Sequence, residues 1–362
     1  MKALILGTGK SGAAALSYLE SAGYEVVTLD DAKDQYGLEA LEGIDLFVPS
    51  PGAARSHHLY RAAVERGIEV AGELELGLRI ANKVCIGVSG TNGKSTLCAL
   101  VAHVLSASGI PAEAVGNFGL PLVEAMRGNS EVLIVELSSF QLETARTPSL
   151  HAAALLPVTP DHLDRYESYE EYTAVKQSLK TLVKPGGQFF AGSPMEAAEF
   201  LVSTLGVSPE KFHSHAQTFK GLPHRLETVK EIDGVLYVND SKATNIAATL
   251  FALKKIDSPS ILMVGGKDKG GDFELLFEMR DQIRAIVAFG TAGPRIARAL
   301  GTRLPLDLTR TLKEAFEAAR ERALPGDAIL LSPACSSFDH FDNYIARGEE
   351  FRNLVGKVGC AE

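Results

Sequence analysis

The chain has 362 residues, more than one hydrophobic core usually supports, so we expect two or three domains. Its net charge of -9 at pH 7 weighs against non-specific binding to nucleic acid or to anionic membranes. No apolar run approaches the roughly 20 residues of a membrane helix, and the apolar stretch after Met1 is too short for a signal peptide. We therefore expect a cytoplasmic protein. The four cysteines are scattered without a CxxC pair, which predicts neither a zinc site nor a disulfide framework.

The first 50 residues have the pattern of a nucleotide-binding βαβ unit. An apolar strand over 2–6 precedes the turn Gly7-Thr8-Gly9-Lys10-Ser11-Gly12, and a predicted helix and second strand lead to Asp30. A GxGxxG turn with an acid about 20 residues later is typical of dinucleotide binding and, taken alone, favours NAD. The glycines themselves show only that a phosphate or the backbone comes close. A third predicted strand, 44–48, ends at Ser50-Pro51-Gly52, which is either a ligand-binding strand end or a plain turn.

A second α/β unit begins near Lys83 with an apolar strand, a glycine-rich turn and a helix. In the turn, which runs from Gly90 to Thr96, backbone amides and the helix N-terminus can surround phosphate oxygens. Lys94 would supply a cation for the phosphates and Ser95 a hydroxyl for Mg²⁺. The strict phosphate-loop pattern has glycine five positions before Gly93, where this chain has Val88. An ordinary glycine-rich turn is the alternative, which we disfavour because GKST stands where strand gives way to helix.

Polar residues follow the next two predicted strands of this unit. Glu136 closes the apolar strand 131–136, where a phosphate-loop domain places a Mg²⁺-binding carboxylate; a surface acid is the alternative. After the following strand, Asp, His, Asp and Arg fall within the five positions 161–165, which indicates a site more than a loop. Lys176, on a predicted helix over 169–182, would by itself be a solvated surface charge.

The remainder of the chain continues the alternation of strands and helices. The turn 184–187 is expected to end the preceding helix, and Gly221-Leu222-Pro223-His224-Arg225 to mark a domain boundary. Polar loops follow the predicted strands, so an α/β fold with a multi-substrate site at strand ends is expected. The predicted strands are 188–191, 235–238, 261–264, 283–289 and 328–331, and the predicted helices are 194–205, one from 208, 246–253 and 311–322.

Six motifs carry a family resemblance: GTNGKST, ELSSFQLE, DHLDRY with a downstream lysine, GLPHRLE, NDSKATN and SPACSSFD. In this order, and over nearly the whole chain, they resemble the ATP-dependent Mur ligases, in particular members that add D-glutamate. The resemblance implies three domains. They are a Rossmann-like UDP-substrate-binding domain (1–82), a central P-loop ATPase-type domain (83–221) and a Rossmann-like amino-acid-binding domain (222–362). It also implies that the first βαβ unit holds a UDP-sugar and not NAD.

The reaction implied by the resemblance is ATP-dependent amide formation in cytoplasmic peptidoglycan precursor synthesis. ATP phosphorylates the carboxylate of UDP-N-acetylmuramoyl-L-alanine, and the amine of D-glutamate displaces phosphate from the acyl phosphate. Such a transfer between anions needs metal and lysine charge more than covalent help from the protein. The resemblance implies two Mg²⁺ ions and a monomer with small-molecule substrates only, without nucleic acid or membrane.

Residue roles carry over by motif. The catalytic set is Lys94, Glu136, His162 and Lys176. The metal ligands are Ser95, Glu136, His162 and Lys176, the last carbamylated by CO₂, a reaction that requires a neutral amine and hence a perturbed lysine pKa. The ATP residues are Gly90, Thr91, Asn92, Gly93, Lys94, Ser95, Thr96, Arg225 and Asp240, with His224 at a motif position beside them. The UDP-sugar residues are Ser11, Asp30, Ser50, Gly52 and Asn117. The D-glutamate residues are Lys242, Thr244, Lys269, Ser337 and Tyr344.

The chain departs from the family pattern at two places. The central segment is short, and Gly192-Ser193-Pro194-Met195-Glu196 stands where the family has a GxHNxxN helix start on the adenine side. Asp31 and Ala32 follow Asp30, where a basic residue would help to hold the nucleotide.

Three other readings stay open. A folylpolyglutamate-type ligase would lack the GTGKSG unit. A regulatory protein derived from a ligase would not need two metals and an amino-acid pocket. An NAD oxidoreductase would explain the first βαβ unit alone.

Overall fold

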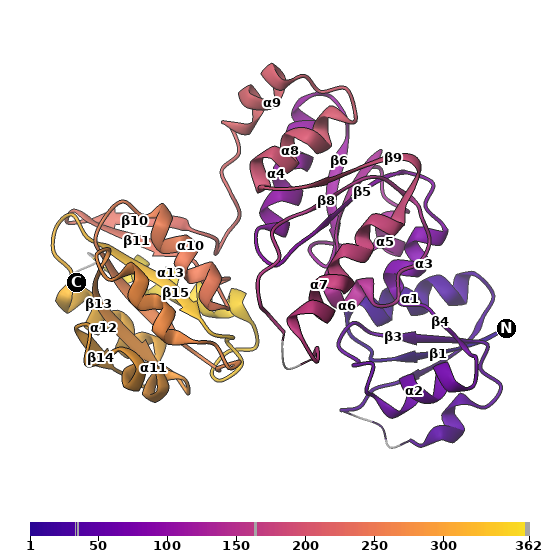
Figure 1. Ribbon diagram of the computed structural model, residues 1–362, viewed down its shortest axis with the longest axis horizontal. Helices are drawn as coiled ribbons and strands as arrows, with labels where there is room; N and C mark the ends of the chain where they lie inside the picture. Colours follow the sequence, from indigo (N-terminus) through magenta and orange to yellow (C-terminus); the bar gives the residue numbers. More distant parts are fainter. Residues whose placement is uncertain (33, 35, 163–164, 359–362) are drawn as a thin grey trace. The chain divides into compact units, whose positions relative to one another are not determined.

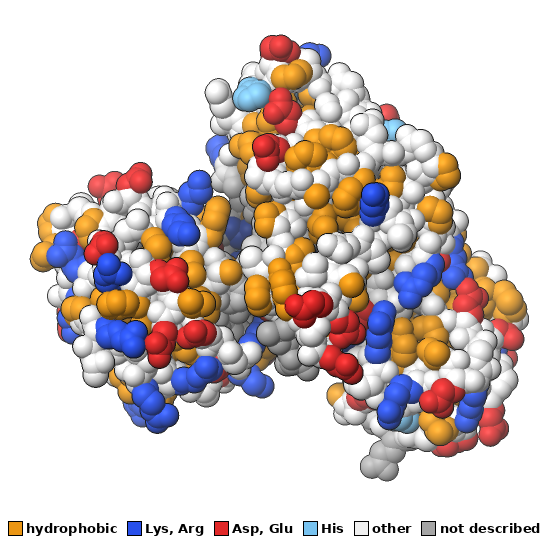
Figure 2. Space-filling model, in the orientation of Figure 1, with side chains coloured by type: hydrophobic (Ala, Val, Ile, Leu, Met, Phe, Trp, Pro, Cys, Tyr) orange, Lys and Arg blue, Asp and Glu red, His pale blue; other side chains and the backbone are white. Residues whose placement is uncertain are grey.

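The computed structural model describes residues 1–32, 34, 36–162 and 165–358 of the chain. It divides into two compact units, one from Met1 to Lys220 and one beginning at Gly221 (Figure 1). The fold is mixed α/β, and every sheet is mainly or wholly parallel. None of the described helices combines the length and the apolar character needed to cross a bilayer. On the face drawn in Figure 2, acidic and basic side chains are interspersed.

The first unit contains two parallel sheets. The N-terminal sheet has the order β2-β1-β3-β4, so its first strand is central and paired on both sides. Its strands are β1 (Lys2–Leu6), β2 (Glu25–Leu29), β3 (Leu46–Pro49) and β4 (Glu69–Val70). Alternate residues of β1 point to opposite faces, so Ala3 and Ile5 join one core and Leu4 and Leu6 the other. The covering helices are α1 (Lys10–Ser21), η1 (Leu38–Leu41), α2 (His58–Glu65) and α3 (Glu73–Arg79).

The second sheet of this unit has the order β6-β7-β5-β8-β9 and is also parallel throughout. Its strands are β5 (Val84–Ser89), β6 (Ala112–Gly116), β7 (Val132–Glu136), β8 (Leu150–Leu155) and β9 (Val183–Ala191). Apolar residues alternate between two cores, with Ile134 in one and Leu133 in the other, as a sheet covered on both faces requires. Its helices are α4 (Lys94–Ala107), α5 (Leu122–Ala125), α6 (Ser139–Leu142), α7 (Tyr169–Gln177), η2 (Ser178–Leu182), α8 (Pro194–Ser203) and α9 (Pro209–Ala216).

Helix α3 joins these two sheets into one unit. Leu74 and Leu78 pack in the core of the second sheet, whereas Leu76 packs in that of the N-terminal sheet. A side chain at Gly77 would place its Cβ 2.6 Å from Leu122 Cγ, so α3 and α5 come too close there for anything but glycine. The strand ends of the two sheets are therefore held in a fixed relation to each other.

The second unit is built on one six-stranded sheet of order β10-β11-β15-β12-β13-β14. Only the hairpin of β10 and β11 is antiparallel among the described pairs. The strands are β10 (Glu227–Ile232), β11 (Val235–Asn239), β12 (Ser260–Gly265), β13 (Ile283–Phe289), β14 (Leu306–Leu308) and β15 (Ala328–Ala334). The helices are α10 (Ile246–Lys255), η3 (Phe273–Met279), α11 (Gly293–Leu300), α12 (Leu312–Arg322) and α13 (Tyr344–Lys357).

Two local predictions were wrong. Residues 184–187 do not end a helix: α7 ends at Gln177, and these residues lie inside β9. The pairing moves from Leu150 opposite Val183 to Ala152 opposite Gln188, so the extra residues loop out where Gly186 has φ +81°. Residues 332–334, predicted as a loop, extend the strand β15, because after a shift in register Ala334 still pairs with Gly265 of β12.

Candidate functional site

The predicted phosphate loop connects β5 to α4. It turns at Gly90, with φ +142°, and at Gly93, with φ +84°, and both values favour glycine. A Cβ at Gly90 would lie 2.5 Å from the Cβ of Leu156, so the loop packs closely on the end of β8. Lys94 folds over the loop and donates to the carbonyl oxygens of Gly90 at 2.9 Å and Thr91 at 2.7 Å. The amides at the start of α4 suit a bound anion. The other predicted residues of this turn lie in the loop or in the first turn of α4: Asn92 and Thr96.

Glu136, at the end of β7, faces the first turn of α4. Its carboxylate accepts hydrogen bonds from the Ser95 hydroxyl and, at 2.7 Å, from the Asn117 amide. Glu136 is 3% exposed and Ser95 4%. The parallel register sets Val88 of β5 opposite Glu136, which brings the two strand ends together. A carboxylate and a hydroxyl are oxygen ligands that Mg²⁺ accepts, so this pair fits a metal at the phosphate loop.

Lys176 is not the solvated charge that a single helix lysine usually is. It is 2% exposed on α7, and its ammonium nitrogen donates to the Gly90 carbonyl at 2.7 Å. Burial and then the charge of Lys94 lower the pKa of Lys176 to about 6, while Asp161 and Glu136 act in the opposite direction. Most of the amine is therefore neutral at pH 7. A neutral amine beside the phosphate loop meets the chemical requirement for carbamate formation.

His162 lies in the loop after β8. Its φ is +55°, and its ring packs edge-on against Phe140 with ring centroids 4.8 Å apart. Thr91 ties this loop to the phosphate loop, because its hydroxyl donates to the Thr159 carbonyl at 3.0 Å. Asp164 of the predicted cluster lies outside the described residues. Within the described ranges, no group of three or more His, Cys, Asp and Glu side chains is arranged to hold a metal ion.

The first glycine-rich turn and the end of β3 meet in the N-terminal sheet. The Ser50 hydroxyl donates to the Gly7 carbonyl at 2.8 Å, and Gly7 has φ +93°. A Cβ at Gly12 would lie 2.0 Å from the Gly7 carbonyl oxygen, so only glycine fits there. Two other predicted UDP-sugar residues lie beside this turn, Ser11 in the first turn of α1 and Gly52 in the loop after β3.

Asp30 and Asn117 also lie near this turn. Asp30 accepts hydrogen bonds from the amide of Thr8 at 3.1 Å and from its hydroxyl at 2.6 Å. Lys10 donates to the carbonyl of Gly119, two residues after Asn117. Asn117 also donates to Glu136. The segment 117–119 therefore connects the glycine turn of the N-terminal sheet with the pair of Ser95 and Glu136 at the second sheet.

In the second unit, Asp240 directly follows β11 and is buried. It accepts hydrogen bonds from the Leu226 amide at 3.1 Å and the Ser332 hydroxyl at 2.9 Å. Burial raises the pKa of Asp240 to about 7 despite these bonds. His224, which has φ +60° and is 4% exposed, precedes the half-buried Arg225. The motifs GLPHRLE and NDSKATN are therefore adjacent in space.

Arg347 on α13 joins the polar loops of the second unit. It is completely buried and donates to the hydroxyl of Ser241 at 3.0 Å and to its carbonyl at 2.8 Å. It also donates to the carbonyls of Cys335 at 3.1 Å and Ser336 at 3.2 Å. Burial lowers the pKa of Arg347 to about 10, which leaves the guanidinium charged at neutral pH.

The structure gathers three of the five predicted D-glutamate residues. The ammonium of Lys242 lies 4.2 Å from the centroid of the Tyr344 ring. Lys242 and Ser337 each follow a serine that Arg347 binds, so they are held on neighbouring loops. Among the described residues, no hydrogen bond or ion pair ties the side chain of Thr244 or Lys269 to this group. These two lie in the loops before α10 and after β12.

Two structural residues of the site were missed from sequence. Glu143 is 2% exposed and binds Arg165, but the short helix α6 that it follows has too few turns to show a periodic pattern. Arg347 could have been found, because it shares a helical spacing with three buried apolar residues, Phe351, Leu354 and Val355. A charge in an apolar stripe is buried only when its donors are satisfied.

The fold and the loop at Gly90 define a phosphate-loop protein of the α/β class. The Mur ligase middle domain matches residues 88–220, and the glutamate ligase domain of Mur ligases matches residues 224–335. The chain is 33% identical to the UDP-N-acetylmuramoylalanine–D-glutamate ligase of Protochlamydia amoebophila, over 98% of this chain and 97% of that protein. It is 35% identical to the enzyme of the same name from Chlamydia caviae, over 99% and 98%.

Solved structures agree at the level of the fold. The UDP-N-acetylmuramate–alanine ligase MurC of Thermotoga maritima superposes with a TM-score of 0.62 at 14% identity, covering 99% of both chains. The Mur ligase MurF of the same organism, solved with ADP, gives 0.56 at 16% identity and covers 88% of this chain and 91% of that one.

The chain belongs to the Mur ligase family, in the group of the UDP-N-acetylmuramoylalanine–D-glutamate ligases. It is a short member. The alignment with the P. amoebophila protein extends over 434 positions against 362 residues here, so at least 72 positions have no counterpart in this chain.

Proposed function

We propose that this protein is an ATP-dependent ligase that joins D-glutamate to UDP-N-acetylmuramoyl-L-alanine in peptidoglycan precursor synthesis. The names of the full-length relatives support this assignment. The observation in the structure that supports it best is the buried pair of Ser95 and Glu136 at a phosphate loop that Lys176 also contacts. A carboxylate becomes a good electrophile only when its oxygen is phosphorylated, and that step needs concentrated positive charge.

For the phosphoryl step, we propose that the phosphate loop and Lys94 hold the ATP phosphates. Ser95 and Glu136 would hold one Mg²⁺ ion, and His162 with carbamylated Lys176 a second. Bound Mg²⁺ neutralises charge on the phosphates and on the acceptor carboxylate. Lys94 already reaches over the loop to two carbonyl oxygens, so its ammonium can move to phosphate oxygens without a change in the backbone. The low pKa of Lys176 leaves its amine free to take up CO₂.

For the substrates, we propose three domains, 1–82, 83–221 and 222–362, each built on one of the three sheets. The first would bind the UDP-sugar through Ser11, Asp30, Ser50 and Gly52, with Asn117 contributed by the second. The third would bind ATP through Arg225 and Asp240. It would bind D-glutamate through Lys242, Thr244, Lys269, Ser337 and Tyr344, where two lysines match the two carboxylates. We further propose a monomer that works in the cytoplasm.

Phosphate release from ATP tests the reaction directly. We expect release only when UDP-N-acetylmuramoyl-L-alanine and D-glutamate are both present, and not with L-glutamate or a folate acceptor. Release with the folate acceptor would favour a folylpolyglutamate-type ligase. No release with any acceptor, while nucleotide still binds, would favour a regulatory relative, a reading to which the missing 72 positions give weight.

Carbamylation of Lys176 has its own test. Wild-type protein in ¹³C-bicarbonate should show a carbamate carbon resonance that the Lys176→Ala variant lacks. The same variant should lose most activity and regain part of it with added short carboxylates, which can replace the missing ligand. A variant of unchanged activity would rule out the role of Lys176.

A further inference from the structure

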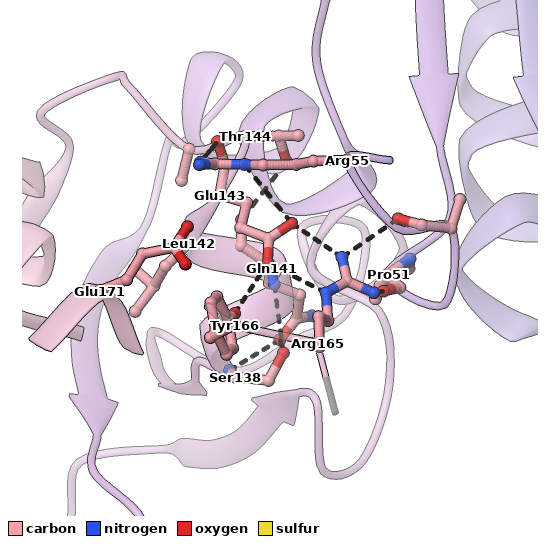
Figure 3. Close-up of polar contacts among 12 residues, drawn as sticks. Pro51, Arg55, Ser138, Gln141, Leu142, Glu143, Thr144, Arg165, Tyr166 and Glu171 are labelled. Atoms are coloured by element: carbon pink, nitrogen blue, oxygen red, sulfur yellow. Dashed lines mark hydrogen bonds and ion pairs between the residues drawn. The ribbon is translucent and has the colours of Figure 1, made fainter. Parts of the chain in front are cut away.

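Glu143 and Arg165 form a buried ion pair in the first unit (Figure 3). The two guanidinium contacts to the carboxylate are 2.7 Å and 3.1 Å, and the side chains are 2% and 11% exposed. Tyr166 donates a further hydrogen bond to the same carboxylate at 2.7 Å. The Arg165 guanidinium also lies 4.0 Å from the centroid of the Phe140 ring. The pair is therefore a shielded, geometrically fixed feature, unlike an ion pair at the surface.

The remaining donors of Arg165 cross to the N-terminal sheet. They contact three successive carbonyl oxygens of the loop after β3, those of Pro51 at 3.1 Å, Gly52 at 3.4 Å and Ala53 at 3.1 Å. Arg55 returns from the same loop to donate to the Glu143 carbonyl at 3.3 Å. Because the acceptors are backbone carbonyls, these contacts hold the main chain of the loop in place. A contact to one loop side chain would fix only that side chain.

Arg165 thus joins two segments with proposed roles. The loop after β3 is proposed to bind the UDP-substrate, and the segment of His162 is proposed to bind the second Mg²⁺ ion. Arg165 lies three residues after His162, and the loop after β3 carries Ser50 and Gly52. The cavity beside the pair, lined by Ser50, Phe140 and Arg165 among others, has about 10 Å³, room for one water molecule at most. Close packing leaves the loop little freedom to shift while Arg165 is in place.

We propose that Arg165, held by Glu143, is a positioning residue for the UDP-substrate. It fixes the loop after β3 relative to the His162 segment, so that the part of the substrate bound by Ser50 and Gly52 is aligned with the phosphate loop. The inference rests on the function proposed above, and it assigns no contact between Arg165 and substrate. Its consequence is selective: the binding of the UDP-substrate depends on Arg165, and the binding of ATP does not.

Two variants separate positioning from mere stabilisation. Arg165→Lys keeps the charge but loses the planar fork that reaches several carbonyls at once. The double variant Arg165→Met/Glu143→Met removes both charges, which avoids the unpaired buried carboxylate that Arg165→Met alone would leave and that could prevent folding. A control for the loss of an arginine–carboxylate pair is Arg322→Met/Asp307→Met, which removes an exposed two-contact pair from the second unit.

The first measurement is the Kd of UDP-N-acetylmuramoyl-L-alanine by calorimetry without ATP. The second is the KM of the UDP-substrate and the KM of ATP in the complete reaction. We expect both variants to raise the Kd and KM of the UDP-substrate about tenfold or more and to change the KM of ATP less than about twofold. The control pair should change neither. Equal rises in both KM values, or unchanged Kd in a folded double variant, would overturn the positioning role. A wild-type protein that binds no UDP-substrate would instead overturn the proposed function, and the inference with it.

Discussion

Two of the most deeply buried cationic side chains, one in each unit, donate to backbone carbonyls but differ in protonation. Lys176 in the first unit and Arg347 in the second are 2% and 0% exposed. The lysine donates to one carbonyl, that of Gly90, whereas the arginine donates to three carbonyls and a hydroxyl. Burial lowers the pKa of both, to about 6 for Lys176 and to about 10 for Arg347.

The difference follows from the intrinsic chemistry of the two groups. A guanidinium spreads its charge over a planar fork with five donors and begins from a pKa above 12, so it stays charged after burial. An ammonium is a compact, strongly hydrated charge, and it loses its proton when water is removed. Arginine thus serves as a permanent crosslink between loops in the second unit. The lysine of the first unit instead loses most of its charge on burial beside the Gly90 carbonyl.

The largest effect should come from removing the charged crosslink. Arg347→Met leaves the buried acceptors on Ser241, Cys335 and Ser336 without donors, and we expect a loss of about 3–5 kcal/mol in the free energy of unfolding. Arg347→Lys should lose less, because it restores part of the bonding. Urea denaturation followed by circular dichroism measures both. A loss below about 1 kcal/mol in Arg347→Met would contradict the role of crosslink.

Removing the neutral lysine should instead alter the pH dependence of stability. Between pH 6 and 10.5 the unfolded state binds one more proton at Lys176 than the folded state, so stability rises with pH. One proton corresponds to about 1.4 kcal/mol per pH unit, or roughly 2–3 kcal/mol between pH 7 and 9.

The Lys176→Met variant should lack this rise. We expect it to be more stable than wild type near pH 7 and to approach wild type near pH 10, when both are measured without CO₂. Parallel pH profiles for the two proteins would show that the folded lysine keeps its proton.

A third prediction concerns the packing around Arg347. Gly348, the next residue on α13, would place a Cβ 2.3 Å from Nδ1 of His224, which is 4% exposed. Gly348→Ala should therefore cost about 1–3 kcal/mol, although alanine normally favours a helix. Gly356→Ala in the same helix meets no described atom within 4 Å and should stabilise by about 0.5–1 kcal/mol. Thermal denaturation decides the matter, and equal signs for the two variants would refute the close contact.

Much of this fold could be predicted from sequence where the pattern was strong. The strands 2–6 and 283–289 were predicted with the bounds that the structure has, because each is apolar apart from one charged residue, Lys2 and Arg284 respectively. The helix α13 was missed, although Phe351, Leu354 and Val355 have a helical spacing. The strand β10, ETVKEI, was missed because it is polar and lies at the edge of its sheet. Strands of two or three residues, such as β4 and β14, are too short to show a period.

The candidate site divides in the same way. Motif spacing placed Ser95 and Glu136 at strand and helix ends that the parallel register then brings together. The contacts of Arg165 could not be predicted, because their acceptors are the carbonyls of Pro51, Gly52 and Ala53, and any residue carries a carbonyl. The low pKa of Lys176 likewise depends on burial, which the sequence of one amphipathic helix does not determine.

The smallest effect should come from an arginine–carboxylate pair at the surface. Comparing it with Arg347 shows how much of the contribution of a hydrogen-bonded arginine depends on burial. Arg322 binds Asp307 through two contacts, one of them at 2.6 Å, but the side chains are 37% and 34% exposed. Water already solvates both charges, so Asp307→Asn should cost less than about 1 kcal/mol at pH 7 and less still in 1 M salt. The hydrogen bonds from Arg322 lower the pKa of Asp307, so this contribution is present above pH 4 and is lost as the pH falls further. Urea midpoints of variant and wild type should therefore converge as the pH is lowered further below 4. A cost comparable to that of Arg347→Met would mean that bond geometry, and not exclusion of water, determines what an arginine contributes in this protein.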